Sequence, residues 1–128
     1  MTTAYWCVLI AIFLPYVFTG IAKIGGGFNL KDNHNPREFL GSLTGASQRA
    51  NWAQQNSFEV TPGFLAAVII AQQVATMSQS SIDTLAIVFV VSRLAYGLCY
   101  VLDQALLRSL VWFVGMGSIA ALLICSAA

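Results

Sequence analysis

The stretch RANWAQQNSFEVTP, residues 49–62, carries many hydrogen-bonding side chains directly before a run of aliphatic residues. Its polar residues recur at steps of three and four, so Arg49, Asn56 and Glu59 share one face of a helix. Trp52 lies on the same face. A structural contact needs one or two such groups, whereas a charged peptide ligand needs several that converge. We therefore expect this face to line a ligand-binding cleft.

A second polar face occurs further along the chain, in the segment that follows residue 82. Steps of three, four and three residues place an arginine, two tyrosines and an aspartate on one helical face: Arg93, Tyr96, Tyr100 and Asp103. The two faces predict two helices whose polar sides turn toward each other, toward a neighbouring subunit or toward a water-filled cleft.

The composition indicates that these helices lie in a membrane. Of the 128 residues, 58% are hydrophobic and 9% are charged. An ordinary soluble domain has about 25% charged residues, and so few charges cannot cover a water-soluble surface. The formal net charge of +1 gives no support for nucleic-acid binding. We expect one membrane domain, residues 1–128, that is all-α and in contact with lipid.

Four segments are long enough to cross the bilayer, which takes about 20 apolar residues. They are residues 3–24, 44–74, 82–102 and 106–127. The connection 25–43 contains signals for the start of a helix, with Asn35 as N-cap and Pro36 at the first helical position. The second helix therefore begins near Pro36, or after a break at Gly41 or Gly45. A bundle of four transmembrane helices is the expected fold.

The distribution of Lys and Arg predicts the orientation. The first ten residues have neither, and the apolar run that they begin is too long for a signal peptide, so we expect a retained helix. The basic residues of the connections lie in or beside the first and the third: Lys23, Lys31, Arg37 and Arg108. We expect the loop 25–43 to be cytoplasmic and both termini to be non-cytoplasmic, in a bacterial inner membrane.

Arg93 lies about eleven residues into its span, roughly 16 Å along a helix and near the bilayer centre. An arginine at that depth costs at least about 2.5–3.5 kcal/mol on insertion scales. A partner is needed, and Glu59 is the expected one. A purely structural Glu59–Arg93 pair is the alternative to a role in ligand binding, as packing is for Tyr96 and Tyr100.

Other kinds of site have little support in the sequence. Cys7, Cys99 and Cys125 lie in three separate apolar segments without a CxxC pair, so we expect buried thiols and neither a metal site nor a disulfide framework. His34, in a His-Asn-Pro turn, is expected to be a solvated loop residue.

The chain resembles the bacterial-type members of the MAPEG family, the membrane-associated proteins of eicosanoid and glutathione metabolism. The resemblance covers nearly the whole chain and rests on the pattern Arg49…Ala53, Asn56, Glu59, Pro62, followed by Arg93, Tyr96 and Tyr100. It implies a homotrimer of four-helix subunits, with glutathione bound between subunits near the cytoplasmic side.

Position by position, the resemblance assigns glutathione binding to six residues: Arg49, Asn56, Glu59, Arg93, Tyr96 and Tyr100. Arg108 resembles the arginine that activates the glutathione thiol. The chain departs from the pattern at Gln48, where the family has a glutamate, and at Trp52, where its eicosanoid enzymes have a further arginine. Glutathione has two carboxylates, and tryptophan cannot bind a carboxylate bidentately as arginine does.

The implied activity is that of a glutathione-dependent transferase or peroxidase acting on lipophilic substrates. A free thiol has a pKa of about 8.5, and a guanidinium such as that of Arg108 lowers it by favouring the thiolate. Two other classes remain open. One is a non-catalytic accessory or assembly subunit of a larger membrane complex, which Gln48 and Trp52 favour, and the other is a binding protein or carrier for a lipophile.

Overall fold

The computed structural model of the protein describes residues 1–127, which form helices joined by short connections. Four of the helices are long and apolar enough to cross a membrane, so the predicted all-α integral membrane protein with four spans is confirmed. The elements, in chain order, are α1 (Thr3–Gly26), the 3₁₀ turn η1 (Asp32–His34), α2 (Pro36–Gly41), α3 (Gly45–Val74), α4 (Gln79–Val101) and α5 (Ala105–Ser126).

Local signals in the sequence account for where these helices start and stop. The α1 helix ends at Gly26, and the Gly27 that follows has a φ of 75°, in the left-handed region that glycine adopts without strain. Before the second span the chain forms both expected starts, since α2 begins at Pro36 and α3 begins at Gly45 after a break. The Asn35 side chain does not accept from the first turn of α2, and its Nδ2 donates to Glu38 Oε2 at 2.6 Å.

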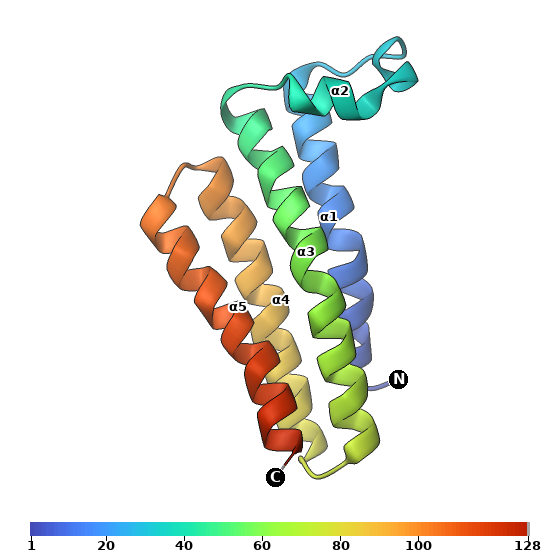
Figure 1. The fold of residues 1–128 in the computed structure, drawn as a ribbon, viewed down its shortest axis with the longest axis vertical. Coiled ribbons are helices and arrows are strands. Elements are labelled where there is room, and N and C mark those ends of the chain that lie inside the picture. Colours follow the sequence, from blue (N-terminus) through green and yellow to red (C-terminus); the bar gives the residue numbers. More distant parts are fainter. Residues whose placement is uncertain (128) are drawn as a thin grey trace.

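The long helices form two hairpins that pack together (Figure 1). The α1 helix packs mainly against α3, α4 packs mainly against α5, and α3 and α4 join the two pairs. The short α2 helix lies across one end of α1 and α3, while both termini and the α3–α4 turn lie at the other end. The α4–α5 turn lies at the same end as α2, so the first and third connections share one side of the bundle.

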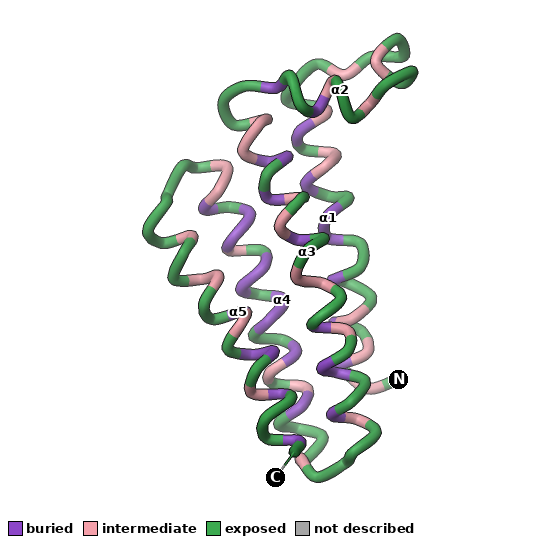
Figure 2. Tube along the Cα trace, viewed as in Figure 1, coloured by how far each residue is buried: buried purple, intermediate pink, exposed green. Residues whose placement is uncertain are grey.

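The bundle has a largely apolar core and an apolar outer surface. Its interior includes the rings of Phe64 and Phe89, which stack 3.9 Å apart and join α3 to α4. The buried residues follow the inward sides of α1, α3 and α4, whereas α5 is exposed over most of its outward side (Figure 2). Exposed side chains such as Leu106, Phe113 and Ile124 give this surface the apolar character that lipid requires.

Small residues bring α4 close to its neighbours. A Cβ atom at Gly97 would collide with the ring of Phe18 on α1. A Cβ atom at Gly115 on α5 would lie 2.7 Å from Ser92 Oγ on α4. Both contacts favour glycine, and both involve the α4 segment that carries the second polar face.

Candidate functional site

The polar faces of α3 and α4 meet in an open cleft of about 420 Å³. Four of its lining residues come from α3 and two from α4: Trp52, Gln55, Asn56, Glu59, Tyr96 and Tyr100. The structure therefore brings four of the residues predicted for the site to one cleft, together with Trp52. Its volume falls in the range of about 300–1,000 Å³ that is common for small-ligand sites.

A second cleft of about 330 Å³ adjoins the first on the α5 side and shares Tyr96 and Tyr100 with it. The remaining lining residues all come from α5: Arg108, Ser109, Trp112 and Phe113. The Arg108 guanidinium lies 4.3 Å above the Tyr100 ring, and the two tyrosine rings meet edge-on at 5.4 Å. The tyrosines thus separate a polar cleft on α3 from a more aromatic one on α5, and Arg108 lines the α5 cleft against the shared Tyr100 ring.

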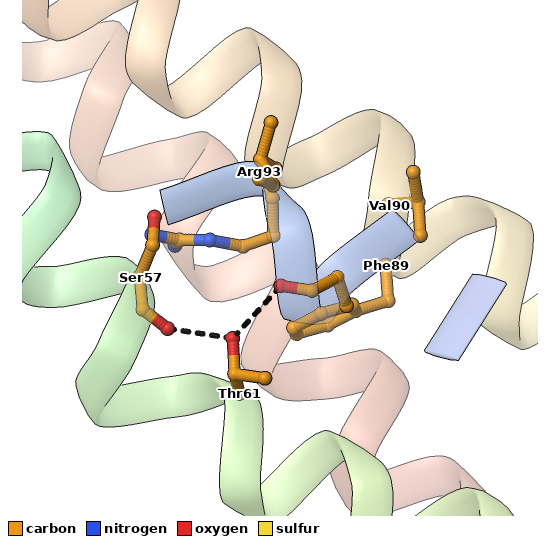
Figure 3. A pocket seen from close by; sticks show the side chains of 7 residues that line it. Ser57, Thr61, Phe89, Val90 and Arg93 are labelled. Carbon is orange, nitrogen blue, oxygen red and sulfur yellow. Dashed lines mark hydrogen bonds between the residues drawn. The ribbon is translucent and has the colours of Figure 1, made fainter. Parts of the chain in front are cut away.

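Arg93 is buried behind the polar cleft instead of lining it. Only 3% of its surface is exposed, and its Nη2 donates to Asn56 Oδ1 at 2.9 Å and to Ser57 Oγ at 3.2 Å. Figure 3 shows the guanidinium extending from α4 to Ser57 on α3, with Thr61 one helical turn further along. The guanidinium also lies 4.1 Å from the centre of the Tyr96 ring. Arg93 therefore holds two cleft residues, Asn56 and Tyr96, from inside.

The prediction of a direct Glu59–Arg93 ion pair is wrong, because Asn56 lies between the two side chains. Within residues 1–127 the Arg93 guanidinium bonds to neutral oxygens, and Asn56 Nδ2 donates to Glu59 Oε2 at 3.1 Å. The Asn56 amide thus links the cation and the carboxylate, with its oxygen toward one and its nitrogen toward the other. The physical reason is helix rotation: Asn56 and Ser57 face α4, whereas Glu59 is exposed toward the cleft.

Arg49 lines neither of the two clefts and binds backbone. Its Nε and Nη2 donate to the carbonyl oxygen of Val101 at 3.2 and 3.0 Å. That carbonyl belongs to the last residue of α4, where the final C=O groups of a helix lack partners within the helix. Arg49 therefore joins the first turns of α3 to the end of α4.

Spacing alone missed Ser57 and three of the α5 residues. Ser57 lies in register with Ala50 and Ala53, which are buried, and a polar residue on such a face of a membrane helix signals an interhelical hydrogen bond. Ser109, Trp112 and Phe113 gave no comparable signal, since their side chains are ordinary for a lipid-facing helix.

His34 and the three cysteines do not line either of the two clefts. His34 is exposed in η1 at the α2 end of the bundle. Cys7 and Cys99 are buried, and Cys125 is exposed near the end of α5. Between residues 1 and 127, no group of three or more His, Cys, Asp and Glu side chains is placed to hold a metal ion.

Comparison with known protein families gives a match over nearly the whole chain. The sequence pattern of the MAPEG family matches residues 3–128. No curated protein matches the sequence.

Proposed function

This chain belongs to the MAPEG family, and on that premise we propose that it is a membrane enzyme that uses glutathione as a thiol substrate against lipophilic compounds. In one reaction the thiol loses its proton and its sulfur bonds to an electrophilic carbon, with the leaving group taking the bonding electron pair. In the other, two thiols reduce a hydroperoxide to an alcohol and water and are themselves oxidised to a disulfide. The observation that carries the proposal is the position of Arg108 in the α5 cleft, against the Tyr100 ring that both clefts share.

The polar cleft offers groups that fit one end of a thiol peptide. The Glu59 carboxylate is exposed and can accept from an ammonium group, while the Gln55 amide is exposed beside it. Asn56 is held by Arg93 and Glu59, so its orientation is fixed before any ligand arrives. Such preorganised groups bind without an added ordering cost.

Arg108 would favour the thiolate over the thiol. Its guanidinium is half-buried against the Tyr100 ring, so it is held in place rather than free in solvent. A fixed cation beside a thiol lowers the pKa of that thiol, and only the thiolate is a good nucleophile. The α5 cleft, with Trp112 and Phe113, would take the lipophilic reactant.

Assembly and orientation are part of the same proposal. Both clefts open on the outside of a single subunit, and a homotrimer would cover them with a neighbouring copy. The end of the bundle that carries α2 also carries Lys23, Lys31 and Arg37, so it would face the cytoplasm of a bacterial inner membrane.

The test is isothermal titration of the detergent-purified protein with glutathione, together with the ultraviolet absorbance of the bound thiolate. We expect saturable binding and a thiolate signal. Arg108→Gln should retain binding to within a few fold and lose the thiolate signal, whereas Lys31→Gln, in the loop before α2, should change neither. Absence of saturable binding would contradict the proposal. If a larger protein then co-purified in stoichiometric amount, the chain would be a non-catalytic accessory or assembly subunit.

A further inference from the structure

We infer that Arg37 binds the carboxylate at the amino-acid end of the thiol peptide, whose ammonium group lies at Glu59. The inference rests on the proposed function, because it takes the ligand to be a thiol peptide with a γ-glutamyl end like that of glutathione. That end carries an ammonium group and a carboxylate on one carbon atom. A protein that binds both needs an anion and a cation close together.

Arg37 lies in a further cleft, of about 300 Å³, between the short α2 helix and α3. Among residues 1–127 it is the one charged side chain that lines this Arg37 cleft. Its side chain is exposed and makes no hydrogen bond or ion pair within that part of the chain. Arg49 and Arg93, in contrast, are bonded to oxygen atoms of the protein. Arg37 can therefore bind a ligand without giving up another partner.

Gln55 joins the Arg37 cleft to the polar cleft, because its exposed side chain lines both. Glu59 lies four residues further along α3, about 6 Å along the axis and on the same face as Gln55. Arg37 on α2 and Glu59 on α3 thus lie beside the same residue. An amino-acid head group over Gln55 can donate from its ammonium group to Glu59 and accept with its carboxylate from Arg37.

The position of Arg37 depends on α2, which is fixed on α3 although it has only six residues. Asn51 Nδ2 donates to the carbonyl oxygen of Leu40 at 3.3 Å, and Leu40 is buried in one apolar cluster with Leu43 and Ala50. A cation on a fixed helix loses less conformational freedom on binding than one on a mobile segment. The fold therefore holds Arg37 beside the polar cleft before a ligand arrives.

The Arg37 cleft also contains an unused hydrogen-bond acceptor. Gln54 lines the cleft, and its Oε1 is buried without a hydrogen-bond partner in residues 1–127. A buried acceptor without a donor is unfavourable, so a ligand that supplies a donor gains affinity there. A peptide N–H is such a donor. The cleft thus offers a cation for a carboxylate and an acceptor for a peptide group.

The charges of the ligand then match those of the joined clefts. The α5 cleft meets the polar cleft at the two tyrosines of α4, and the Arg37 cleft meets it at Gln55 on α3. Arg108 favours the thiolate on the first side in the proposed function. On the second side Glu59 binds the ammonium group and Arg37 binds the carboxylate on the same carbon atom.

A neighbouring copy over these clefts is compatible with the pair of Arg37 and Glu59. In a closed ring of identical chains there is one Arg37 and one Glu59 for each site, whatever further groups the neighbour adds. The cover also excludes water, which strengthens the attraction between opposite charges. A comparison of ligands that differ by one carboxylate isolates the role of Arg37, because contacts of the neighbour with the rest of the peptide cancel.

The experiment is isothermal titration of the full chain in detergent with three thiol peptides. They are glutathione, its C-terminal carboxamide, and an analogue with 4-aminobutyrate in place of the γ-glutamyl residue, which lacks only the carboxylate of the amino-acid end. The wild type should bind glutathione at least about tenfold more tightly than the 4-aminobutyryl analogue, which corresponds to about 1.4 kcal/mol. In Arg37→Gln this ratio should fall to within about twofold, while the ratio of glutathione to its carboxamide stays unchanged. Lys31→Gln removes a positive charge from the preceding loop and should change neither ratio.

The outcomes separate this inference from the proposed function. Equal wild-type affinities for glutathione and the 4-aminobutyryl analogue would overturn the inference, as would a tenfold ratio that persists in Arg37→Gln. A change in the carboxamide ratio alone would assign Arg37 to the other carboxylate and overturn it too. These results leave the proposed function in place, whereas binding of none of the peptides by the wild type would contradict the proposed function. If Arg37→Gln fails to fold, Arg37→Met carries the same test.

Discussion

Replacing Asn56 by leucine is expected to destabilise the protein by about 1.5–2 kcal/mol, because it removes the acceptor of a bond from a buried cation. Interhelical hydrogen bonds in membrane proteins contribute about 0.6 kcal/mol on average. This bond should exceed the average, because its donor is ionised, its length is 2.9 Å and Arg93 is only 3% exposed. The bond to Ser57 at 3.2 Å remains, which limits the loss.

The second half of the test replaces the cation as well. Arg93→Met combined with Asn56→Leu removes both partners, and an apolar pair of similar volume often costs little at such a position. The double variant should therefore be more stable than the sum of the two single losses predicts, by about 1–2 kcal/mol. Glu59→Gln, at the expected but unformed ion pair, should lower stability less than Asn56→Leu does.

The assay is reversible denaturation in detergent, followed by circular dichroism, for the wild type, both single variants and the double variant. Gln55→Leu is the matched control: it makes a comparable change on an adjacent, exposed residue and should lie within about 0.5 kcal/mol of the wild type. Strict additivity of the Asn56 and Arg93 losses would refute the reasoning, because it would mean that the two side chains do not interact.

Three further outcomes follow from the backbone and the charge distribution. Arg49→Ala should lower the free energy of unfolding by about 1 kcal/mol, and with it the melting temperature, because the Val101 carbonyl loses its charged donor. An unchanged melting temperature would contradict this role. Ala75→Gly should raise stability by about 0.5 kcal/mol, since Ala75 has a φ of 56°, and a lower melting temperature would count against it. In a cysteine-free background, Ser80→Cys should react with an impermeant reagent on intact cells and Asn33→Cys should not; the opposite pattern would reverse the orientation.

The sequence predicted the helices and their polar faces because both depend on local spacing. About 20 apolar residues define a span wherever they occur, and steps of three and four residues define a face. This is why Asn56 and Glu59 on one helix, and Tyr96 and Tyr100 on the next, lie around one cleft in the structure.

Residue spacing could not predict which groups the basic residues bind. Glu59 and Asn56 are one helical turn apart and at similar depth, so only the rotation of α3 about its axis decides which of them meets Arg93. The direction of the Arg49 side chain depends on where α4 ends, and that end is fixed by the turn into α5. Both depend on how the helices pack together, which the residue spacing within one helix does not determine.

The length of α3 ties the polar cleft to the thickness of the membrane. At 1.5 Å per residue its 30 residues extend about 45 Å, against about 30 Å for a typical hydrocarbon core. The C-terminal half of α3 is the apolar half, so the excess length lies on the side of Trp52. In a thin bilayer that end of the cleft stands among the lipid headgroups, where a water-soluble ligand can reach it. Each added ångström of acyl chain draws it toward the hydrocarbon, so that bilayer thickness, together with the side chains of the cleft, affects how readily a polar ligand enters.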